Sequence, residues 1–249
     1  FIPGWVNGPY DPSYAKTTLG TPGAGLATEL AALPSNSVVP IPAGYDFMQA
    51  STLPIAGLTA WSSLITEGNL QREGIVLILG TGGVSIFALQ IAKAFGAKTI
   101  VLSKSNAKLA KATQLGADYV HNYAEQPNWD EAVMDITHGQ GVDVVVEAAG
   151  IGTLSRSLNS VRGEGVVSLF GVLTGLEGDV SLWPFIRKRA RLAGIFVDSR
   201  NAYMDFVTFI EKHSLTPIID STFEFNQLKE AFARMQSAEH FGKIVIKGK

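Results

Sequence analysis

The chain has 249 residues, of which 46% are hydrophobic and 17% are charged, and its formal net charge at pH 7 is −2. This composition predicts a soluble globular protein with a substantial core, and the slight negative charge argues against a nucleic-acid surface. The sequence contains no cysteine, which excludes disulfides, thiolate zinc ligands and cysteine nucleophiles within this chain. The lack of cysteine fits a reducing cytoplasm, the location that we expect.

The first part of the chain, residues 1–57, is rich in proline and glycine. Two segments in it, 26–33 and 37–42, resemble short strands or turns, so we expect a small β-rich unit. The sequence begins at Phe1 rather than at Met, and its first residues do not show the pattern expected of a secretory signal. We therefore expect a chain that lacks the opening part of this unit.

From about residue 58 onward, apolar runs alternate with amphipathic helical patterns. Several runs are apolar throughout, which is typical of parallel strands with both faces covered by helices. The pattern predicts a doubly wound, six-stranded parallel Rossmann sheet in an α/β domain. The six expected strands are residues 75–79, 98–103, 118–121, 142–149, 165–171 and 191–197. The uncharged run 75–92 is long enough for a membrane span, but its three glycines favour a buried strand and helix, so no membrane partner is expected.

The last part of the chain has no evident place in this sheet. It consists of an expected helix at 201–212, an apolar run at 216–220, a helix at 226–237 and a strand at 243–247. We expect these elements to return to the N-terminal unit. The predicted domains are therefore 58–197 for dinucleotide binding, with 1–57 and 198–249 together forming a discontinuous second domain.

A glycine-rich turn, GTGGVS at 80–85, follows the first strand and opens a helix. In a dinucleotide-binding turn the first glycine permits the tight bend, and the second lets the backbone approach a pyrophosphate at the helix N-terminus. Ser85 stands where the fingerprint has a third, packing glycine, and its small side chain fits there. The alternative is a plain strand-to-helix turn, but the alternating context favours a cofactor site. The candidate cofactor-binding residues here are Gly80, Thr81, Gly82, Gly83 and Val84.

The end of the second strand indicates which dinucleotide binds. An acidic residue there would bind the ribose 2′-hydroxyl of NAD(H), but no Asp or Glu occurs between Gly80 and Lys108. Ser103, Lys104 and Lys108 instead offer a hydroxyl group and two cations, which suit a 2′-phosphate. We therefore expect NADP(H) to be preferred over NAD(H). Alternatively, Ser103 or the neighbouring Ser105 caps a helix and the lysines are solvated, and both roles can coexist.

An ordered series of motifs extends over nearly the whole chain. It comprises ASTLPIAGLTAWSSL at 50–64, GIVLILGTGGVSIFALQIAKAFGAKTI at 74–100, LGADYVHNY at 115–123, GVDVVVEAAG at 141–150, GVVSLFGV at 165–172 and HFGKIVI at 240–246. This series resembles the medium-chain dehydrogenase/reductases, in particular their zinc-independent alcohol dehydrogenase and quinone-oxidoreductase-like branch. The resemblance implies a Rossmann domain inserted in a GroES-like catalytic domain, with the nicotinamide in the cleft between them. It also implies a homo-oligomer formed through the strand at 191–197.

The resemblance also implies roles for individual residues. Thr59 would lie beside the nicotinamide and is the catalytic candidate, while Lys243 would contact the pyrophosphate together with Gly82, Gly83 and Val84. Tyr123 would pack by the 2′-phosphate, and Ala148 and Ala149 would cover the adenine ribose. The implied nicotinamide wall consists of Phe170, Gly171, Val172, Phe196 and Val197. By residue type alone, the two phenylalanines are better explained as core residues, and Lys243 as a solvated lysine.

The chain departs from the zinc-dependent relatives. Where they carry a cysteine ligand ahead of the LTAW-like segment, this chain has Ile55, and residues 1–12 contain none of the cysteines of their structural-zinc loop. The four histidines, His121, His138, His213 and His240, are scattered without metal-site spacing. We therefore expect no zinc.

These observations predict an NADPH-dependent oxidoreductase that acts on a small molecule. Hydride would pass between the nicotinamide and an alcohol or carbonyl, or the β-carbon of an activated alkene such as an enone or quinone. Without zinc, the charge developing on the substrate oxygen needs a hydrogen-bond donor or water. Thr59 is the candidate placed near the nicotinamide, where it could equally serve the nicotinamide ribose, and Tyr10 and Tyr14 are further candidates without positional support. The alternative is a non-catalytic dinucleotide-binding protein with a structural or sensing role.

Overall fold

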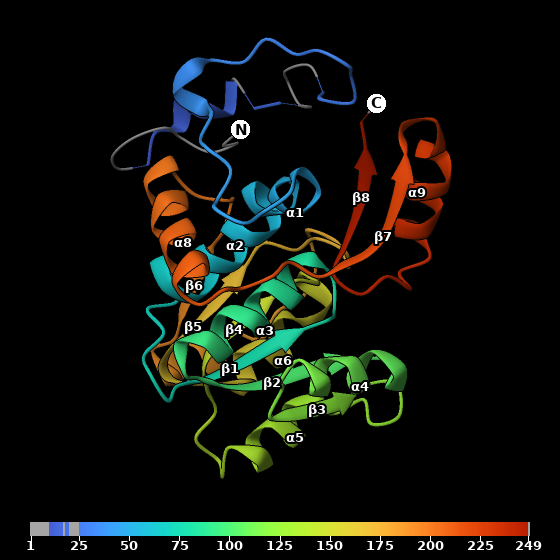
Figure 1. Ribbon diagram of the computed structural model, residues 1–249. Helices are drawn as coiled ribbons and strands as arrows, with labels where there is room; N and C mark the ends of the chain where they lie inside the picture. The colour runs from blue at the N-terminus through green and yellow to red at the C-terminus, as the bar shows by residue number, and fades with distance from the viewer. Residues whose placement is uncertain (1–9, 17, 20–24, 249) are drawn as a thin grey trace.

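The computed structural model describes residues 10–16, 18–19 and 25–248 (Figure 1). A six-stranded sheet forms the centre of the molecule, and a two-stranded sheet stands to one side of it. The strands of the large sheet are β1 (Ile75–Leu79), β2 (Lys98–Ser103), β3 (Tyr119–Asn122), β4 (Val142–Glu147), β5 (Val161–Leu169) and β6 (Arg191–Gly194).

The large sheet has the strand order β3-β2-β1-β4-β5-β6, and every neighbouring pair is parallel. This is the order of a doubly wound dinucleotide-binding fold, so the predicted fold class is confirmed. The strand order reverses between β1 and β4, and in such sheets a ligand binds beyond the carboxyl ends of the strands at this switch point. The glycine turn follows β1 at this position.

Successive residues of β1 enter two different cores, because side chains of a strand alternate between the faces of a sheet. Val76 and Ile78 belong to one buried cluster and Leu77 and Leu79 to the other. All four are at most 5% exposed. The continuous apolar run of this strand therefore reflects burial on both faces, as a central parallel strand requires.

One face of the sheet is covered by α2 (Leu58–Trp61), α3 (Gly83–Phe95) and α8 (Arg200–Lys212). Phe206 of α8 is fully buried and packs against the rings of Trp61, Phe87 and Tyr203. α4 (Asn106–Gln114) contributes Ala112 to the same core. Because α8 packs into this core, it covers the large sheet although it lies beyond the predicted boundary at 197/198, and the domain division stays a prediction.

The other face is covered by α5 (Trp129–Ile136) and α6 (Ile151–Ser160), with α7 (Trp183–Lys188) beside them. The Lys188 ammonium donates to the carbonyl oxygens of Asn159 (2.5 Å) and Val161 (2.7 Å) at the end of α6. It thereby satisfies carbonyl groups that a helix end leaves without partners. Lys188 thus stabilises the end of α6.

The described residues before 58 form no strands. They contain the 3₁₀ helices η1 (Pro12–Lys16) and η2 (Ser35–Ser37), then α1 (Phe47–Ser51) and the π-helical turn η3 (Leu53–Gly57). Of the short strands or turns expected at 26–33 and 37–42, the strand alternative is therefore wrong. Pro40 and Pro42 have no amide hydrogen to donate to a sheet, and neither segment has a neighbouring strand.

After α2, the π-helical turn η4 (Ser62–Thr66) leads to β1. At the other end of the chain, β7 (Ile219–Glu224) and β8 (Lys243–Lys247) form the separate two-stranded parallel sheet. They are joined by η5 (Phe225–Gln227) and α9 (Leu228–Gln236), which packs on both strands (Figure 1). Among the described residues, no helix combines the length and apolarity needed to cross a bilayer, and the run 75–92 divides into β1 and α3 as expected.

Candidate dinucleotide site

The glycine turn leaves open space above its second glycine. Gly80 has φ +78°, a left-handed conformation that glycine adopts without strain. Gly82 has φ −76° and ψ −174° and is the N-cap residue of α3, which begins at Gly83. A Cβ atom on Gly82 would meet no heavy atom of the described residues within 4 Å, so there is open space beside this glycine at the helix N-terminus.

Ser85 has a definite structural role in this turn. Its hydroxyl group donates to the carbonyl oxygen of Leu79 at 2.8 Å, and the side chain is 3% exposed. The hydrogen bond ties the first turn of α3 to the end of β1. The substitution of the fingerprint's third glycine by serine is therefore compatible with close packing of helix and strand.

Lys243, the first residue of β8, lies directly over the glycine turn. A Cβ atom on Gly83 would come within 2.5 Å of its Cδ and within 3.3 Å of the Cβ of Ala56. Burial lowers the pKa of the Lys243 ammonium, and this lysine forms no ion pair with any acidic side chain of the described residues. Lys243 is thus not the solvated lysine of the simpler interpretation. A desolvated cation beside a helix N-terminus is a site that favours an anion.

Backbone contacts hold this part of the second sheet against the turn. The Gly242 amide donates to the carbonyl oxygen of Thr81 at 3.1 Å, and Gly82 and Gly242 form an isolated parallel bridge. Val84 packs against the core that contains α3. Segments far apart in the sequence are therefore joined at the predicted pyrophosphate position.

The ends of β2 and β3 lie side by side, which brings two predicted 2′-phosphate residues together. The Tyr123 amide donates to the Ser103 carbonyl at 3.2 Å. The Ser103 hydroxyl accepts from the Ser105 amide at 3.3 Å, and the Ser105 side chain caps α4. Lys104 is exposed beside them. The capping interpretation is thus correct for Ser105, and it leaves the Lys104 ammonium accessible to a ligand.

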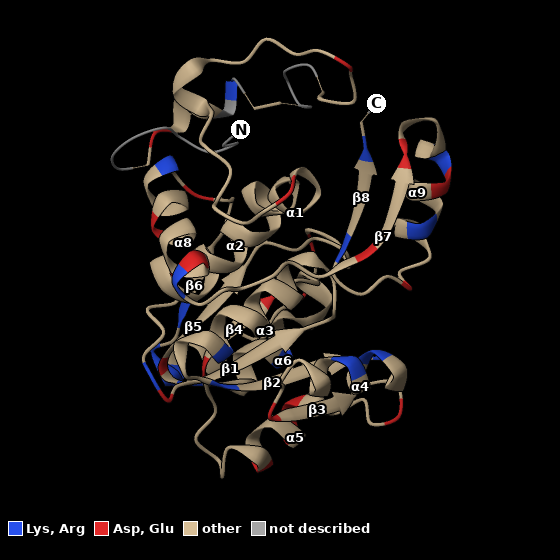
Figure 2. Ribbon diagram, in the orientation of Figure 1, with Lys and Arg blue, Asp and Glu red and all other residues tan. Residues whose placement is uncertain are grey.

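Lys108 is also not a simple solvated lysine. Its ammonium donates to the carbonyl oxygen of Ala238 at 2.5 Å, which joins α4 to the loop that precedes β8. Burial lowers its pKa, and the positive charges of Arg234 and Lys104 act in the same direction. Figure 2 shows basic residues along α4 and at the start of β8.

Ala148 and Ala149 follow β4 and contact the predicted nicotinamide wall. A Cβ atom on Gly171 would lie 1.7 Å from the carbonyl oxygen of Ala148, so the two backbones touch and only glycine fits. The Ala149 amide donates to the carboxylate of Glu147 at 2.8 Å, and the Gly150 amide donates to the same oxygen at 3.1 Å.

Glu147 is a residue that the sequence reasoning missed. It is fully buried at the carboxyl end of β4 and also accepts hydrogen bonds from the hydroxyl groups of Thr153 (2.7 Å) and Ser157. Its carboxylate fixes the loop that carries Ala148 and Ala149. An acidic residue that ends an otherwise apolar strand was the available signal.

Four residues of the predicted wall line one cavity of about 380 Å³ at the ends of β5 and β6. They are Phe170, Gly171, Val172 and Phe196. Phe196 is 61% exposed, so it is not a core residue, whereas Phe170 also packs against the first core. Val197 does not line this cavity; it packs against that core with φ +57°, a rare conformation for a β-branched residue and one found at functional sites.

The three candidate hydrogen-bond donors, Thr59, Tyr10 and Tyr14, have different positions. The ring of Tyr14 lies 5.9 Å from that of Phe196, and Tyr10 packs edge-on against Tyr14 at the same distance. The N-terminal segment therefore reaches the cavity. Thr59 is 4% exposed within α2 and does not line the cavity, so its catalytic role stays a prediction.

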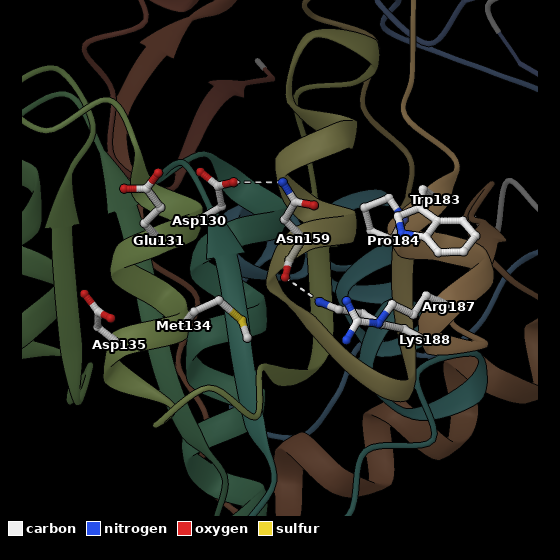
Figure 3. A pocket seen from close by; sticks show the side chains of 9 residues that line it. All are labelled: Asp130, Glu131, Met134, Asp135, Asn159, Trp183, Pro184, Arg187 and Lys188. Atoms are coloured by element: carbon white, nitrogen blue, oxygen red, sulfur yellow. Dashed lines mark hydrogen bonds between the residues drawn. The ribbon is translucent and has the colours of Figure 1, made fainter.

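A larger cavity of about 540 Å³ lies between α5, α6 and α7 (Figure 3). Acidic side chains of α5 stand on one side of it and basic side chains of α7 on the other. Asn159 bridges the acidic and basic sides. Its side-chain amide donates to the Asp130 carboxylate at 3.0 Å, and its backbone carbonyl oxygen accepts from the Lys188 ammonium. None of the predicted site residues lines this cavity.

The described residues contain no group of three or more His, Asp or Glu arranged to hold a metal ion. Ile55, at the place of the cysteine ligand in zinc-dependent relatives, is 53% exposed. His121 is engaged with the carbonyl oxygen of Gln126 at 2.8 Å. Residues outside the described part are not covered by this observation, so zinc independence stays a prediction.

The fold and the glycine turn together define a protein that binds a nicotinamide dinucleotide. The family model described as "Zinc-binding dehydrogenase" matches residues 83–212. A zinc-type alcohol dehydrogenase-like protein of Schizosaccharomyces pombe is 35% identical over 258 residues, which cover 99% of this chain and 73% of that protein. The chain belongs to this zinc-binding dehydrogenase family, within the medium-chain dehydrogenase/reductases.

Solved structures agree with this assignment. A crystal structure from Sinorhizobium meliloti 1021, provisionally named an alcohol dehydrogenase, has a TM-score of 0.92 and 40% identity, with 99% of this chain and 73% of that chain covered. A structure named NAD-dependent alcohol dehydrogenase has a TM-score of 0.85 and 28% identity, with 92% and 67% covered. The chain is thus an oxidoreductase of the alcohol dehydrogenase superfamily, and it spans only part of the length of each relative.

Proposed function

We propose that this protein is an NADPH-dependent oxidoreductase that transfers hydride between the nicotinamide and an alcohol or carbonyl, or an activated alkene, without zinc. The observation that carries the proposal is the glycine turn. It combines open space above Gly82, a helix N-terminus, and the Lys243 ammonium, whose pKa burial lowers and which forms no ion pair among the described residues. Burying an unpaired cation is unfavourable unless an anion compensates it, and a dinucleotide pyrophosphate is such an anion.

The residues around the turn fit the cofactor. Gly82, Gly83 and Lys243 would hold the pyrophosphate, and the backbone of Ala148 would lie against the adenine-side ribose. When bound, the nicotinamide supplies the hydride chemistry. The chain's own residues then bind and orient the cofactor, and the wall formed by Phe170 and Phe196 limits access of water to the reacting carbon.

The preference for NADP(H) is supported by the end of β2. Lys104 is exposed there and Lys108 is nearby, and no acidic side chain occurs between Gly80 and Lys108. A 2′-phosphate would be attracted by these cations, whereas an acidic residue would repel it. Because one solved relative is named NAD-dependent, the preference must be measured directly. We expect the Kd for NADPH to be about tenfold below that for NADH, which corresponds to about 1.4 kcal/mol.

The absence of zinc is supported by residue types. The chain contains no cysteine, and Ile55 cannot bind a metal. Without a metal ion, a hydrogen-bond donor or water must stabilise charge on the substrate oxygen. Tyr14 is a candidate because it lies beside Phe196, and burial together with Tyr10 raises the pKa of its phenol. The phenol therefore stays protonated at neutral pH and can donate a hydrogen bond.

The cavity indicates the substrate class. Its lining is mostly aliphatic and aromatic, with Leu154, Leu176 and Ile195 beside the predicted wall residues. An apolar carbonyl compound, enone or quinone would bury hydrocarbon there.

The test is turnover of NADPH with a panel of enones, quinones and aldehydes, with and without a chelator. Turnover that survives exhaustive chelation supports the proposal, and loss of activity on chelation refutes zinc independence. Tight NADPH binding without turnover on any substrate would favour the non-catalytic alternative.

We also propose a homo-oligomer formed through β6, which is an edge strand of the large sheet. Unpaired backbone groups on such an edge can pair with a second copy of the chain, and Leu192 on this strand is 41% exposed. Light scattering would measure the mass in solution, and a monomer at micromolar concentration would refute this part of the proposal.

A further inference from the structure

The loop between α9 and β8, residues 238–242, joins the two ends of the candidate cofactor site. At one end its Ala238 carbonyl accepts from the Lys108 ammonium at 2.5 Å. At the other end the Gly242 amide donates to Thr81 in the glycine turn at 3.1 Å. Between them, Phe241 is 4% exposed, with the Lys111 ammonium 5.7 Å from its ring centre. Any residue of this loop that faces α4 therefore stands between the predicted 2′-phosphate and pyrophosphate positions.

His240 stands in this loop, two residues after Ala238 and two residues before Gly242. Its Nδ1 atom is buried and has no hydrogen-bond partner among the described residues. Burial lowers the pKa of the imidazole, and the nearby charges come from four different elements. These charges are Lys108 on α4, Asp220 on β7, Arg234 on α9 and Lys243 on β8.

The acidic side chain in this group is already committed to other partners. Asp220 accepts from Arg234 at 3.1 Å and 3.3 Å and from the Phe241 amide at 2.9 Å. Arg234 is further paired with Glu239 at 3.0 Å. Among the described residues, Lys108 and Lys243 form no ion pair. Lys108 contacts Ala238, which precedes His240 in the loop, and Lys243 follows His240 at the start of β8. This arrangement repels an added proton when no anion is present and would hold one when an anion is bound.

We propose that His240 is a ligand of the cofactor's 2′-phosphate and takes up a proton when that phosphate binds. The inference rests on the proposed function and adds a residue to it. The 2′-phosphate is favoured over the pyrophosphate because Lys108, in the first turn of α4 just after Lys104 and the end of β2, donates to the Ala238 carbonyl oxygen two residues before His240. A phosphate placed among these three side chains brings up to two negative charges and acceptor oxygens.

The consequence is a cofactor-specific dependence on pH. In the nucleotide-free protein, burial and the neighbouring cations keep His240 neutral near pH 7. A bound 2′-phosphate raises its pKa, so the complex binds one more proton than the free protein, and affinity increases as pH falls. NAD(H) lacks this phosphate and should show no such change.

The test measures Kd for NADP⁺, NAD⁺ and adenosine 2′,5′-bisphosphate by calorimetry at pH 6 and pH 8. Three proteins are compared: the wild type, His240→Gln, which keeps a donor but cannot titrate, and His138→Asn as a control. His138 lies in a turn with φ +52°, which Asn adopts readily. The phosphate of the ligand itself titrates near pH ~6, and this contribution is the same for all three proteins.

For NADP⁺ and for the bisphosphate, the measured quantity is the factor by which Kd falls between pH 8 and pH 6. We expect this factor to be about tenfold larger in the wild type and the control than in His240→Gln, as a pKa shift of about one unit implies. Binding of NAD⁺ should change equally in all three proteins. Equal pH dependence of NADP⁺ binding in wild type and His240→Gln would overturn the inference while leaving the proposed function intact. No binding of NADP⁺ to the wild type at all would overturn both.

A second measurement does not depend on any variant. The chain has four histidines, so imidazole NMR signals can be followed individually as pH is varied. Addition of adenosine 2′,5′-bisphosphate should raise the pKa of one histidine, and ADP should not. A pKa that rises equally with ADP would assign His240 to the pyrophosphate and refute the 2′-phosphate role.

Discussion

Replacement of Gly82 by alanine separates the cofactor role of the glycine turn from its structural role. The backbone of Gly82 has an ordinary φ of −76°, and an added Cβ would meet nothing within 4 Å. Alanine in place of glycine at a compatible position stabilises a protein by about 0.4–1 kcal/mol, while its weaker helix capping costs about as much. The free energy of unfolding of the nucleotide-free protein should therefore change by less than about 1 kcal/mol.

Cofactor binding should respond quite differently. The added methyl group would occupy the space in which we place the pyrophosphate, and loss of one charge-assisted hydrogen bond costs about 1.5–3 kcal/mol. We expect Kd for NADPH to rise roughly 10- to 150-fold. At a concentration equal to 100 times the wild-type Kd, NADPH stabilises the wild type by about 2.7 kcal/mol, and after a hundredfold loss of affinity by only about 0.4 kcal/mol.

The assay is thermal unfolding with and without NADPH, together with fluorescence titration of the cofactor. Gly163→Ala is the matched control, because its Cβ would meet its nearest atom at 3.8 Å and it lies outside the glycine turn. Unchanged NADPH affinity in Gly82→Ala would refute the close approach of a phosphate. A large loss of stability in the absence of nucleotide would show that the turn is intolerant of alanine for structural reasons.

Three further substitutions test the remaining parts of the site. Lys243→Met should weaken NADPH binding at least tenfold. Burial lowers the pKa of this lysine, so the folded state binds the lysine proton less tightly than the unfolded chain does. The free energy of unfolding of the wild type should therefore rise as pH increases from the lowered pKa to the ordinary value, and the variant should lose this rise. Ser103→Asp should raise the Kd for NADPH about tenfold and lower the Kd for NADH. The carboxylate can still accept a hydrogen bond from the Ser105 amide, but it repels a 2′-phosphate. An unchanged cofactor preference in binding assays would contradict the assignment. Gly171→Ala should lower the free energy of unfolding by more than about 2 kcal/mol in denaturant titration, because its Cβ would lie 1.7 Å from the Ala148 carbonyl oxygen. A free energy of unfolding equal to that of Gly163→Ala would show that the backbones of Gly171 and Ala148 do not touch.

The sheet was predictable because its evidence is local. The run 75–79 is apolar at every position, and a strand buried on both faces requires this composition. The glycine turn is similarly local, since its backbone conformations depend on residues in immediate succession. Ser85 could be anticipated as a packing residue, but its hydrogen bond to the Leu79 carbonyl oxygen could not, because that bond depends on how α3 packs on the end of β1.

The N-terminal unit could not be predicted in the same way. Residues 26–33 and 37–42 have strand-like composition, yet a strand forms only when a neighbour supplies the other half of each hydrogen bond. No such neighbour exists among the described residues. Glu147 was missed for a related reason, because a single acidic letter does not reveal that four donors will surround it in the fold.

The sequence by itself determined the order of strands and helices, the glycine turn and the acid-free end of β2. Only the tertiary structure decided which distant segments meet: Lys243 over Gly83, Ala148 against Gly171, and the loop with His240 between α4 and the turn. The physical reason is that backbone propensity and apolar periodicity act over a few residues, whereas the electrostatics of a site depend on which side chains the packed core brings together. A lysine that is unremarkable in the sequence becomes a desolvated cation only when β8 docks on the helix N-terminus.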